Sequence, residues 1–440
     1  MRCIRFSLAI ALLAALSACG GGSEPTTPPA TTGSLTVQVV GLTGGGTPSL
    51  QVTGPSGFAT TLTSAQTLTG LAPGSYTVTA PAVAGTLYAF SGPATAPTAQ
   101  VTAGATASVT VTYTASSGAL NLVIEGLPGG VLPTVQLTGP GGFTQNLTAS
   151  TTLPNLVPGS YTITAPLTAD LGVGYMAVSG PTEVSAGATA TRTLTYSLAV
   201  NARISTDRTD DSGLPQVKFL YALPSDAADR GFDTDRTIHR TVSSWQRWFA
   251  GQANGRRFRF DTFQGALDIA FVRLARTEAQ YAGYGITMRD SLEKDLAALG
   301  FNSATKAYAV YFDGVNTTAC GSAPRPPALP GRIAGLYLKG TPPGAAGCAT
   351  NAFATSPTAA PGYLEFVMVH EILHILGVVD AAAPNHAFDG HVGNDPRDLM
   401  YAGVQPWAPS LLDATRTNYF NTTSLGGLIN LALSPYLVVP

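Results

Sequence analysis

The sequence predicts a multidomain protein in which two tandem all-β sandwich modules precede an α/β (α+β) domain. Three observations support this fold class. Residues 33–199 contain a duplicated segment, rich in Val and Thr, in which apolar and polar residues alternate as in antiparallel β-sandwiches. Composition changes near Asn201, after which strand-like and helix-like segments follow one another. A chain of 440 residues is also too long for one core of ordinary size.

The N-terminus carries the features of an export signal. Arg2 and Arg5 precede the apolar run 7–16, and small residues follow it up to Cys19. This order predicts a secretory signal peptide over residues 1–18, in which the apolar run is too short to span a bilayer. The Leu-Ser-Ala-Cys ending resembles the bacterial lipobox, and the resemblance implies lipidation of Cys19. Ordinary signal cleavage nearby is the alternative.

Residues 19–32 are rich in Gly, Ser, Thr and Pro, which favours a flexible tether. We therefore expect an exported, membrane-anchored lipoprotein at the outer membrane or cell surface, which contacts the membrane through its N-terminal lipid. Charged residues make up 11% of the chain and the formal net charge is −2. Because no strongly basic face is implied, nucleic acid is excluded as a partner.

Two modules are predicted at 33–115 and 116–199. The duplication is visible in paired segments: GPSGF at 54–58 and GPGGF at 139–143, LAPGSYTVTAP at 71–81 and LVPGSYTITAP at 156–166. The Pro-Gly-Ser-Tyr-Thr segment resembles the final hairpin of prealbumin-like and other Ig-like modules of bacterial surface proteins. Few charged residues and no histidine occur here. We expect a stalk or spacer, with carbohydrate or protein binding as the alternative.

The third domain is predicted at 214–440, after an Arg- and Asp-rich linker at 200–213. Apolar periodicity predicts buried strands alternating with amphipathic helices. The expected strands are 217–223, 258–275 (one or two strands), 306–313 and 332–339, and the expected helices are 233–250, 287–299 and 365–376. Outside the signal region the chain contains two cysteines, Cys320 and Cys348, which in an exported protein most simply form one disulfide.

Four of the five histidines lie close together near the third helix. His370 and His374 would lie one helical turn apart on one face, with Glu371 beside them. Such a pair can bind a divalent metal, while the carboxylate holds a water or accepts its proton. The helix is apolar nearly all round, so these polar groups would be unfavourable without partners. Gly377 marks the point where the chain leaves the helix.

The pattern His370-Glu371-x-x-His374-x-x-Gly377, followed by Met400, resembles the metzincin zinc endopeptidases. That resemblance implies that His370 and His374 bind zinc and that Glu371 is the general base. It also implies that Met400 lies beneath the site without touching the metal. No glutamate follows Glu371, so a downstream glutamate as third ligand, as in thermolysin-like sites, is excluded.

The third zinc ligand is open. Asp380 occupies the position of the family's third histidine, as in the snapalysin-like variant, and a carboxylate is an adequate ligand. His386 and His391 follow in the next loop, and either could reach the metal. We prefer His386, with Asp380 and His391 as the alternatives.

The expected function is a zinc-dependent endopeptidase that acts on a protein or peptide substrate, with Glu371 activating a metal-bound water. The extended substrate would add to the sheet edge, which we place near 333–339. The alternative is a surface adhesion or scaffold lipoprotein whose third domain is not catalytic.

Overall fold

The computed structural model describes residues 30–440 except 327–328, 345 and 403–405. The predicted signal peptide, Cys19 and most of the tether lie outside the described residues. The chain forms two compact units, Met1–Gly118 and Ala119–Pro440. In the part of the chain that the structure describes, no helix combines the length and hydrophobicity that crossing a membrane requires. The fold class is as predicted, two β-sandwich modules followed by a mixed α/β region.

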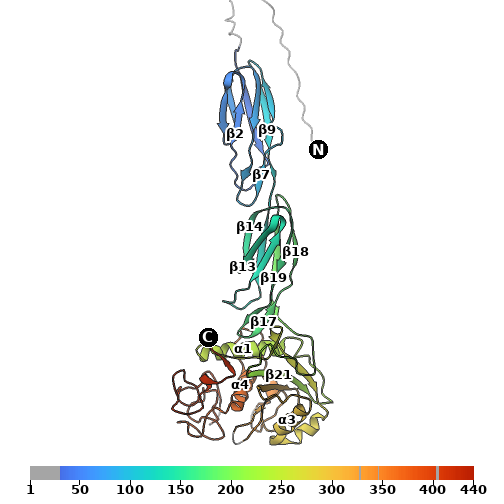
Figure 1. The fold of residues 1–440 in the computed structure, drawn as a ribbon, viewed down its shortest axis with the longest axis vertical. Coiled ribbons are helices and arrows are strands. Elements are labelled where there is room, and N and C mark those ends of the chain that lie inside the picture. The colour runs from blue at the N-terminus through green and yellow to red at the C-terminus, as the bar shows by residue number, and fades with distance from the viewer. Residues whose placement is uncertain (1–29, 327–328, 345, 403–405) are drawn as a thin grey trace, which may run out of the picture. The chain divides into compact units, whose positions relative to one another are not determined.

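The first unit is a β-sandwich (Figure 1). Its strands are β1 (Gly33–Val40), β2 (Leu50–Thr53), β3 (Ala59–Leu62), β4 (Gln66–Leu71), β5 (Gly74–Thr79), β6 (Val83–Ala84), β7 (Ala89–Ser91), β8 (Thr98–Val101), β9 (Thr106–Thr112) and β10 (Thr114–Ala115). They pair in the orders β4-β1-β9, β3-β2-β5-β8 and β10-β7-β6. Alternate residues such as Leu35, Val52 and Val78 are fully buried between the sheets, as the period-two pattern requires.

The second module repeats this topology. Its strands are β11 (Gly118–Glu125), β12 (Val135–Gly139), β13 (Phe143–Leu147), β14 (Thr151–Leu156), β15 (Gly159–Thr164), β16 (Thr168–Asp170), β17 (Val173–Met176), β18 (Gly180–Val184), β19 (Thr189–Thr195) and β20 (Ser197–Leu198). The orders β14-β11-β19, β13-β12-β15-β18 and β16-β17-β20 mirror those of the first module. Equivalent tyrosines make the same bond: the Tyr76 hydroxyl donates to the Ala72 carbonyl (3.1 Å) and that of Tyr161 to Val157 (3.0 Å).

The α/β region is built on one five-stranded sheet. Its strands are β21 (Gln216–Leu223), β25 (Ile269–Arg273), β26 (Lys306–Phe312), β27 (Gly321–Ser322) and β28 (Ile333–Tyr337), and its helices are α1 (Thr237–Gln252), α2 (Glu278–Ala282), α3 (Met288–Ala298) and α4 (Tyr363–Ile375). Four short strands complete the region: β22 (Arg257–Phe258), β23 (Thr262–Phe263), β24 (Ala266–Leu267) and β29 (Leu437–Val438). The sheet order is β25-β21-β26-β28-β27, and all its strands run parallel except β27, which pairs antiparallel with β28.

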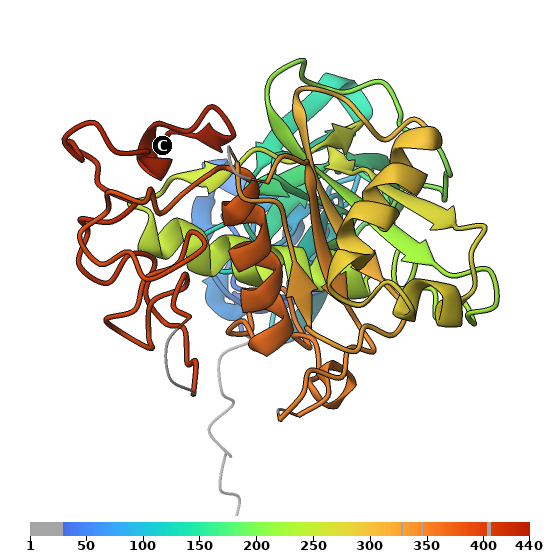
Figure 2. The same ribbon diagram turned by 90° about the horizontal axis from the view of Figure 1, so that it is seen from below.

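Helices cover both faces of this sheet (Figure 2). Residues of α1 and α4 share one core with every second residue of β26, including Ala309 and Tyr311. Residues of α3 share the opposite core with Tyr308 and Val310 of the same strand. The central strands are therefore buried on both sides, which explains their continuous apolar sequence. The layering places α4, with its histidines, directly against β28 and β26.

The predicted helix over 233–250 begins later, at Thr237. Asp233 is instead buried and pairs with Arg203, and the Asp235 side chain accepts the Thr237 amide at 2.7 Å. The helix therefore starts after these carboxylates, because they are used in tertiary and turn contacts rather than as a cap.

The segment expected to be a linker packs against the α/β region. Ile204 accepts the Phe271 amide at 2.8 Å, and Asp207 and Asp210 contact the Lys306 ammonium at 2.8 and 2.6 Å. Asp261 contacts the same ammonium at 2.8 Å. These three carboxylates are close enough to suggest a metal site, but the ammonium groups of Lys306 and Lys218 already lie among them and offset much of their charge.

Candidate metal centre

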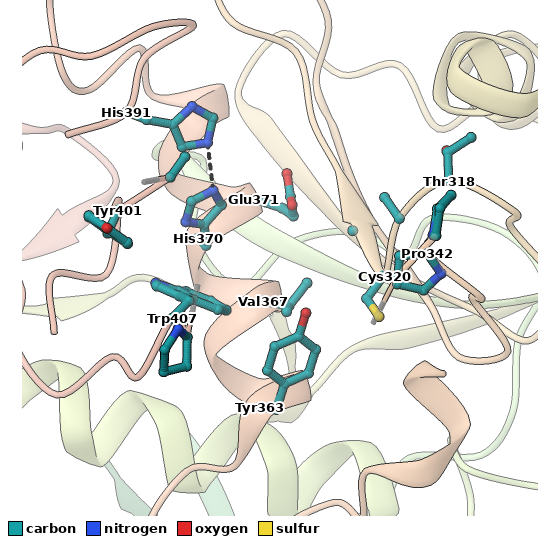
Figure 3. A pocket seen from close by; sticks show the side chains of 16 residues that line it. Thr318, Cys320, Pro342, Tyr363, Val367, His370, Glu371, His391, Tyr401 and Trp407 are labelled. Carbon is teal, nitrogen blue, oxygen red and sulfur yellow. Dashed lines mark hydrogen bonds between the residues drawn. The ribbon is translucent and has the colours of Figure 1, made fainter. Parts of the chain in front are cut away.

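Helix α4 carries the candidate site, and both its ends are anchored. Near its start, the buried Glu365 accepts the Gly362 amide (3.1 Å), the Ala354 amide (2.7 Å) and the Thr241 hydroxyl of α1 (3.2 Å). After its last turn, Gly377 adopts a φ of 70°, a left-handed conformation that glycine takes without strain. The helix is thus held in a fixed register, which places His370 and Glu371 beside the cleft (Figure 3), with His374 one turn after His370.

Three imidazoles meet at one point. The Nε2 atoms of His370, His374 and His391 are each 3.1 Å from the other two. His391 comes from a loop in which its own amide donates to the Phe388 carbonyl at 3.0 Å, and its carbonyl accepts the Ala387 amide at 2.9 Å. The preceding Gly390 has a φ of 77° and lies against His374, where a Cβ would be 3.4 Å from Nδ1. This turn delivers His391 to the helical pair.

Protons cannot account for this arrangement. His370 Nδ1 lies 2.7 Å from the Leu399 carbonyl and His391 Nδ1 lies 3.1 Å from the Phe388 carbonyl, so in the neutral rings these nitrogens carry the hydrogen. Their Nε2 atoms then both present lone pairs, and the single proton that His374 could offer satisfies at most one of them well. Burial lowers the pKa of His370 to about 3, and burial also moves those of His374 and His391 down. A bound cation would satisfy the lone pairs that the neutral rings leave without a proton.

The donor set fits a metal ion. Imidazole nitrogens 3.1 Å apart are spaced as three ligands of one tetrahedral zinc ion would be. Three protein ligands would leave one position for a further ligand. The Nδ1 bonds to backbone carbonyls orient two of the rings, as second-sphere partners of metal-binding histidines do. The cluster of His370, His374 and His391 could therefore hold a metal ion.

Two of the residues proposed for the third position lie elsewhere. The Asp380 carboxylate accepts the Ala382 amide at 2.8 Å and so closes the turn that follows α4. His386 pairs through its backbone with Val392, and its side chain lines a neighbouring cavity. Because residues 386–392 fold as a tight hairpin, His391 rather than the preferred His386 reaches His370 and His374. The Asp389-Gly390 turn signal directly before His391 was the clue in the sequence.

Glu371 lies beside the histidines and points into the cleft (Figure 3). It is 8% exposed, and burial raises its pKa to about 8, while the Arg325 guanidinium draws it down. Among the described residues its carboxylate has no hydrogen-bond partner, so both oxygens are available to a water or a substrate. A buried carboxylate of this kind is suited to accepting a proton near neutral pH.

Met400 is fully buried in the turn that supports the site. The neighbouring Leu399 supplies the carbonyl that accepts from His370. Asp398, which sequence reasoning did not select, organises this turn: its carboxylate accepts the Met400 amide (2.9 Å), the Ala414 amide (2.7 Å) and the Tyr419 hydroxyl (2.7 Å). An Asp in front of a hydrophobic turn was the available signal, because buried carboxylates commonly cap backbone amides.

Two cavities meet at the site. One, of about 680 Å³, has apolar walls that include Tyr363, Val367 and Trp407. The other, of about 510 Å³, has walls that include Asn316 and Arg325. Both share His370, Glu371, His391 and the strand β27. The candidate site therefore lies in the floor of a cleft that continues in two directions.

Cys320 and Cys348 form a disulfide whose Cα atoms are 5.6 Å apart. Cys348 is fully buried and Cys320 is 4% exposed. The bond joins β27 to the loop whose Pro342 and Pro343 wall the apolar cavity. Its place at the cleft makes it a support for the site rather than a nucleophile.

Comparison with known proteins gives fold-level likeness alone. No protein-family model matches the chain, and no curated protein matches it. Among solved structures, the Bacillus anthracis TIE protein is similar over 42% of this chain (15% identity, TM-score 0.20), and the chain spans 38% of that protein. The minor pilin of Streptococcus agalactiae is similar over 40% (12% identity, TM-score 0.18) and is covered fully. The shaft pilin of Lactobacillus rhamnosus GG is similar over 39% (7% identity, TM-score 0.22) and is also covered fully. At these scores the likenesses carry no argument about activity.

Proposed function

We propose that this protein is a zinc-dependent endopeptidase of metzincin type, exported and anchored through a lipid on Cys19. One observation carries the proposal. Three imidazole nitrogens converge, two of them from buried histidines of α4, directly beside a buried carboxylate that has no partner among the described residues. Metal-assisted hydrolysis requires at least a set of metal ligands and a carboxylate beside it that can act as general base.

The roles of the residues follow from their positions. His370, His374 and His391 would bind zinc, which supplies a Lewis acid and lowers the pKa of its bound water toward ~7. Glu371 accepts the proton of the attacking water on its carboxylate and passes it to the departing amine nitrogen. Met400 and Leu399 hold the floor of the site through the bond to His370. Trp407, whose ring centre is 5.5 Å from that of His370, shields the same ring on the cleft side.

The substrate would lie along β27. The expected edge near 333–339 is not open, because β28 is covered there by the antiparallel pair Gly321–Leu336 and Ser322–Gly335. The outer edge of the sheet is therefore β27, which borders both cavities. An extended peptide added to this edge would cross the metal site and continue at both ends, which supports cleavage within a chain.

The test compares the purified protein with Glu371→Gln. We expect the wild type to bind one zinc per chain and to cleave casein or gelatin, with loss of activity in the presence of a chelator. Glu371→Gln should bind zinc equally but cleave at least 100-fold more slowly, because it cannot accept the proton. Glu183→Gln, which changes an exposed carboxylate of the second sandwich, is the matched control and should behave as the wild type. A wild type that retains no metal would refute the proposal.

A second function is favoured by the two sandwich modules. They carry few charged residues and no histidine and repeat one topology, as expected of a spacer or binding stalk. The protein would then be a surface adhesion or scaffold lipoprotein whose metal site is structural. Zinc bound at one per chain, with wild type and Glu371→Gln equally inert on broad peptide libraries, would support this function over the first.

A further inference from the structure

Gly321 occupies a special position in the cleft. It is the first residue of the two-residue edge strand β27 and borders both cavities that meet at the candidate metal site. The carbonyl of the preceding Cys320 accepts the Tyr337 amide at 2.7 Å, so Cys320 and Tyr337 form a hydrogen-bonded pair of the antiparallel ladder. Because antiparallel pairs alternate, the amide and carbonyl of Gly321 face away from β28. They are directed toward the open edge of the sheet.

The absence of a side chain at Gly321 is required by its surroundings. A Cβ there would lie 2.6 Å from Glu371 Oε1, 2.8 Å from Glu371 Cγ and 2.5 Å from Val367 Cγ1. All three distances are shorter than any van der Waals contact between such atoms. The backbone of β27 therefore leaves no room for a Cβ between Gly321 and the side chain of Glu371.

The strand itself cannot easily withdraw. Cys320 is tied to the buried Cys348 by the disulfide, and its carbonyl is bonded to β28. The Glu371 carboxylate, in contrast, has no hydrogen-bond partner among the described residues, so packing alone sets its position. A side chain at position 321 would consequently displace the carboxylate rather than the strand.

We propose that Gly321 is a positioning residue for the cleft: the absence of a side chain at this position allows the Glu371 carboxylate to lie where it does. This inference rests on the proposed hydrolytic function. It assigns a requirement for glycine to an edge strand that is too short to be recognised from sequence.

The test is Gly321→Ala in the purified protein. We expect one zinc per chain to be retained, because no ligand changes, while kcat falls about 10–100-fold as the carboxylate is displaced. The matched control is Gly335→Ala on the adjacent strand, where a Cβ would come no closer than 3.3 Å to any atom and would not meet Glu371. That variant should keep kcat within twofold. Unchanged kcat and KM in Gly321→Ala would overturn the inference.

A thermal-unfolding cycle tests the contact without using activity. The loss of Tm caused by Gly321→Ala should be larger in the wild-type background than in Glu371→Ala, because the second variant removes the atoms that clash. Equal losses in the two backgrounds would overturn the inference. An inactive wild type would refute the proposed function alone, since the Tm cycle still reports the contact between Gly321 and Glu371. If Gly321→Ala folds poorly, Val367→Ala added to it removes the other clash and restores a measurable protein.

Discussion

Replacing His391 by alanine should weaken zinc binding about 100–1000-fold. The three Nε2 atoms form an equilateral set with edges of 3.1 Å, so each contributes equally to the site. Four-ligand zinc sites in small peptides bind with apparent free energies of about 10–16 kcal/mol, which corresponds to roughly 2.5–4 kcal/mol per ligand. Loss of one imidazole therefore costs about two to three powers of ten in affinity.

The assay is competition with a chromophoric chelator, together with thermal unfolding at a fixed excess of free zinc. A 100-fold loss of affinity removes about 2.7 kcal/mol of zinc-dependent stabilisation. His386→Ala and Asp380→Ala are matched controls from the same loop, and both should bind zinc within threefold of the wild type. If His386→Ala loses zinc and His391→Ala keeps it, the assignment from the structure is refuted and the preference from sequence restored.

Two further predictions concern buried polar groups. Asp398→Ala should weaken zinc binding about 10–100-fold, because the turn that presents the Leu399 carbonyl to His370 loses three hydrogen bonds. Zinc affinity equal to that of Asp395→Ala, a partly exposed neighbour, would contradict this prediction. His239 is buried in α1, both its ring nitrogens lack partners among the described residues, and burial lowers its pKa to about 4. The unfolded protein therefore binds a proton at His239 more readily than the folded protein. The contribution of His239 to the free energy of unfolding is complete above pH ~6.5 and is lost as the pH falls toward 4, by about 2–3 kcal/mol at pH ~4.5. Urea denaturation followed by tryptophan fluorescence should show that His239→Leu loses correspondingly less stability between neutral and acid pH; equal acid sensitivity would disprove the prediction.

Local sequence patterns were sufficient to predict the two β-sandwich repeats and helix α4. The two modules alternate polar and apolar residues along each strand, and that period determines which face is buried without knowledge of the rest of the chain. Helix α4 is apolar nearly all round, which could be recognised directly as a buried helix whose polar residues need partners. Both features depend on neighbours in sequence, so the sequence alone was enough to predict them.

The third histidine depended on how a loop folds. Asp380, His386 and His391 all follow α4 within reach of the site, and all are chemically able to bind zinc. The choice is made by two turns, one closed by the Asp380 carboxylate and one through Gly390, which together bring His391 inward. Turn residues indicate where a chain reverses, but which side chain then faces a partner depends on packing against that partner.

The sequence also led us to expect an open sheet edge near 333–339 and a linker at 200–213. The structure differs from both expectations for a related reason. Strand β27 is two residues long, so it has no periodicity to detect. Segment 200–213 is rich in Arg and Asp, which is typical of exposed linkers. In the structure Asp207 and Asp210 of this segment pair with Lys306, and Asp207 also pairs with the fully buried Lys218. These ion pairs hold the segment in place. Composition identifies charged residues but not their partners.

Helix α1 contacts both the second sandwich and helix α4. Tyr175 and Leu171 of the sandwich contact Ser243 and Gln246 on one side of α1, and Asp170 pairs with Arg247. On another side of the same helix, Ser244 donates to the Ala359 carbonyl just before α4, and the Thr241 hydroxyl donates to Glu365 near its start.

A fragment that began after the sandwich would leave Arg247 without its partner Asp170 and would uncover strand β24, which packs against β17. The sandwich therefore belongs to the same folding unit as the candidate site, in keeping with the compact unit Ala119–Pro440. Removal of the sandwich would disturb α1 first and, through Thr241 and Glu365, the end of α4 that sets the register of its histidines.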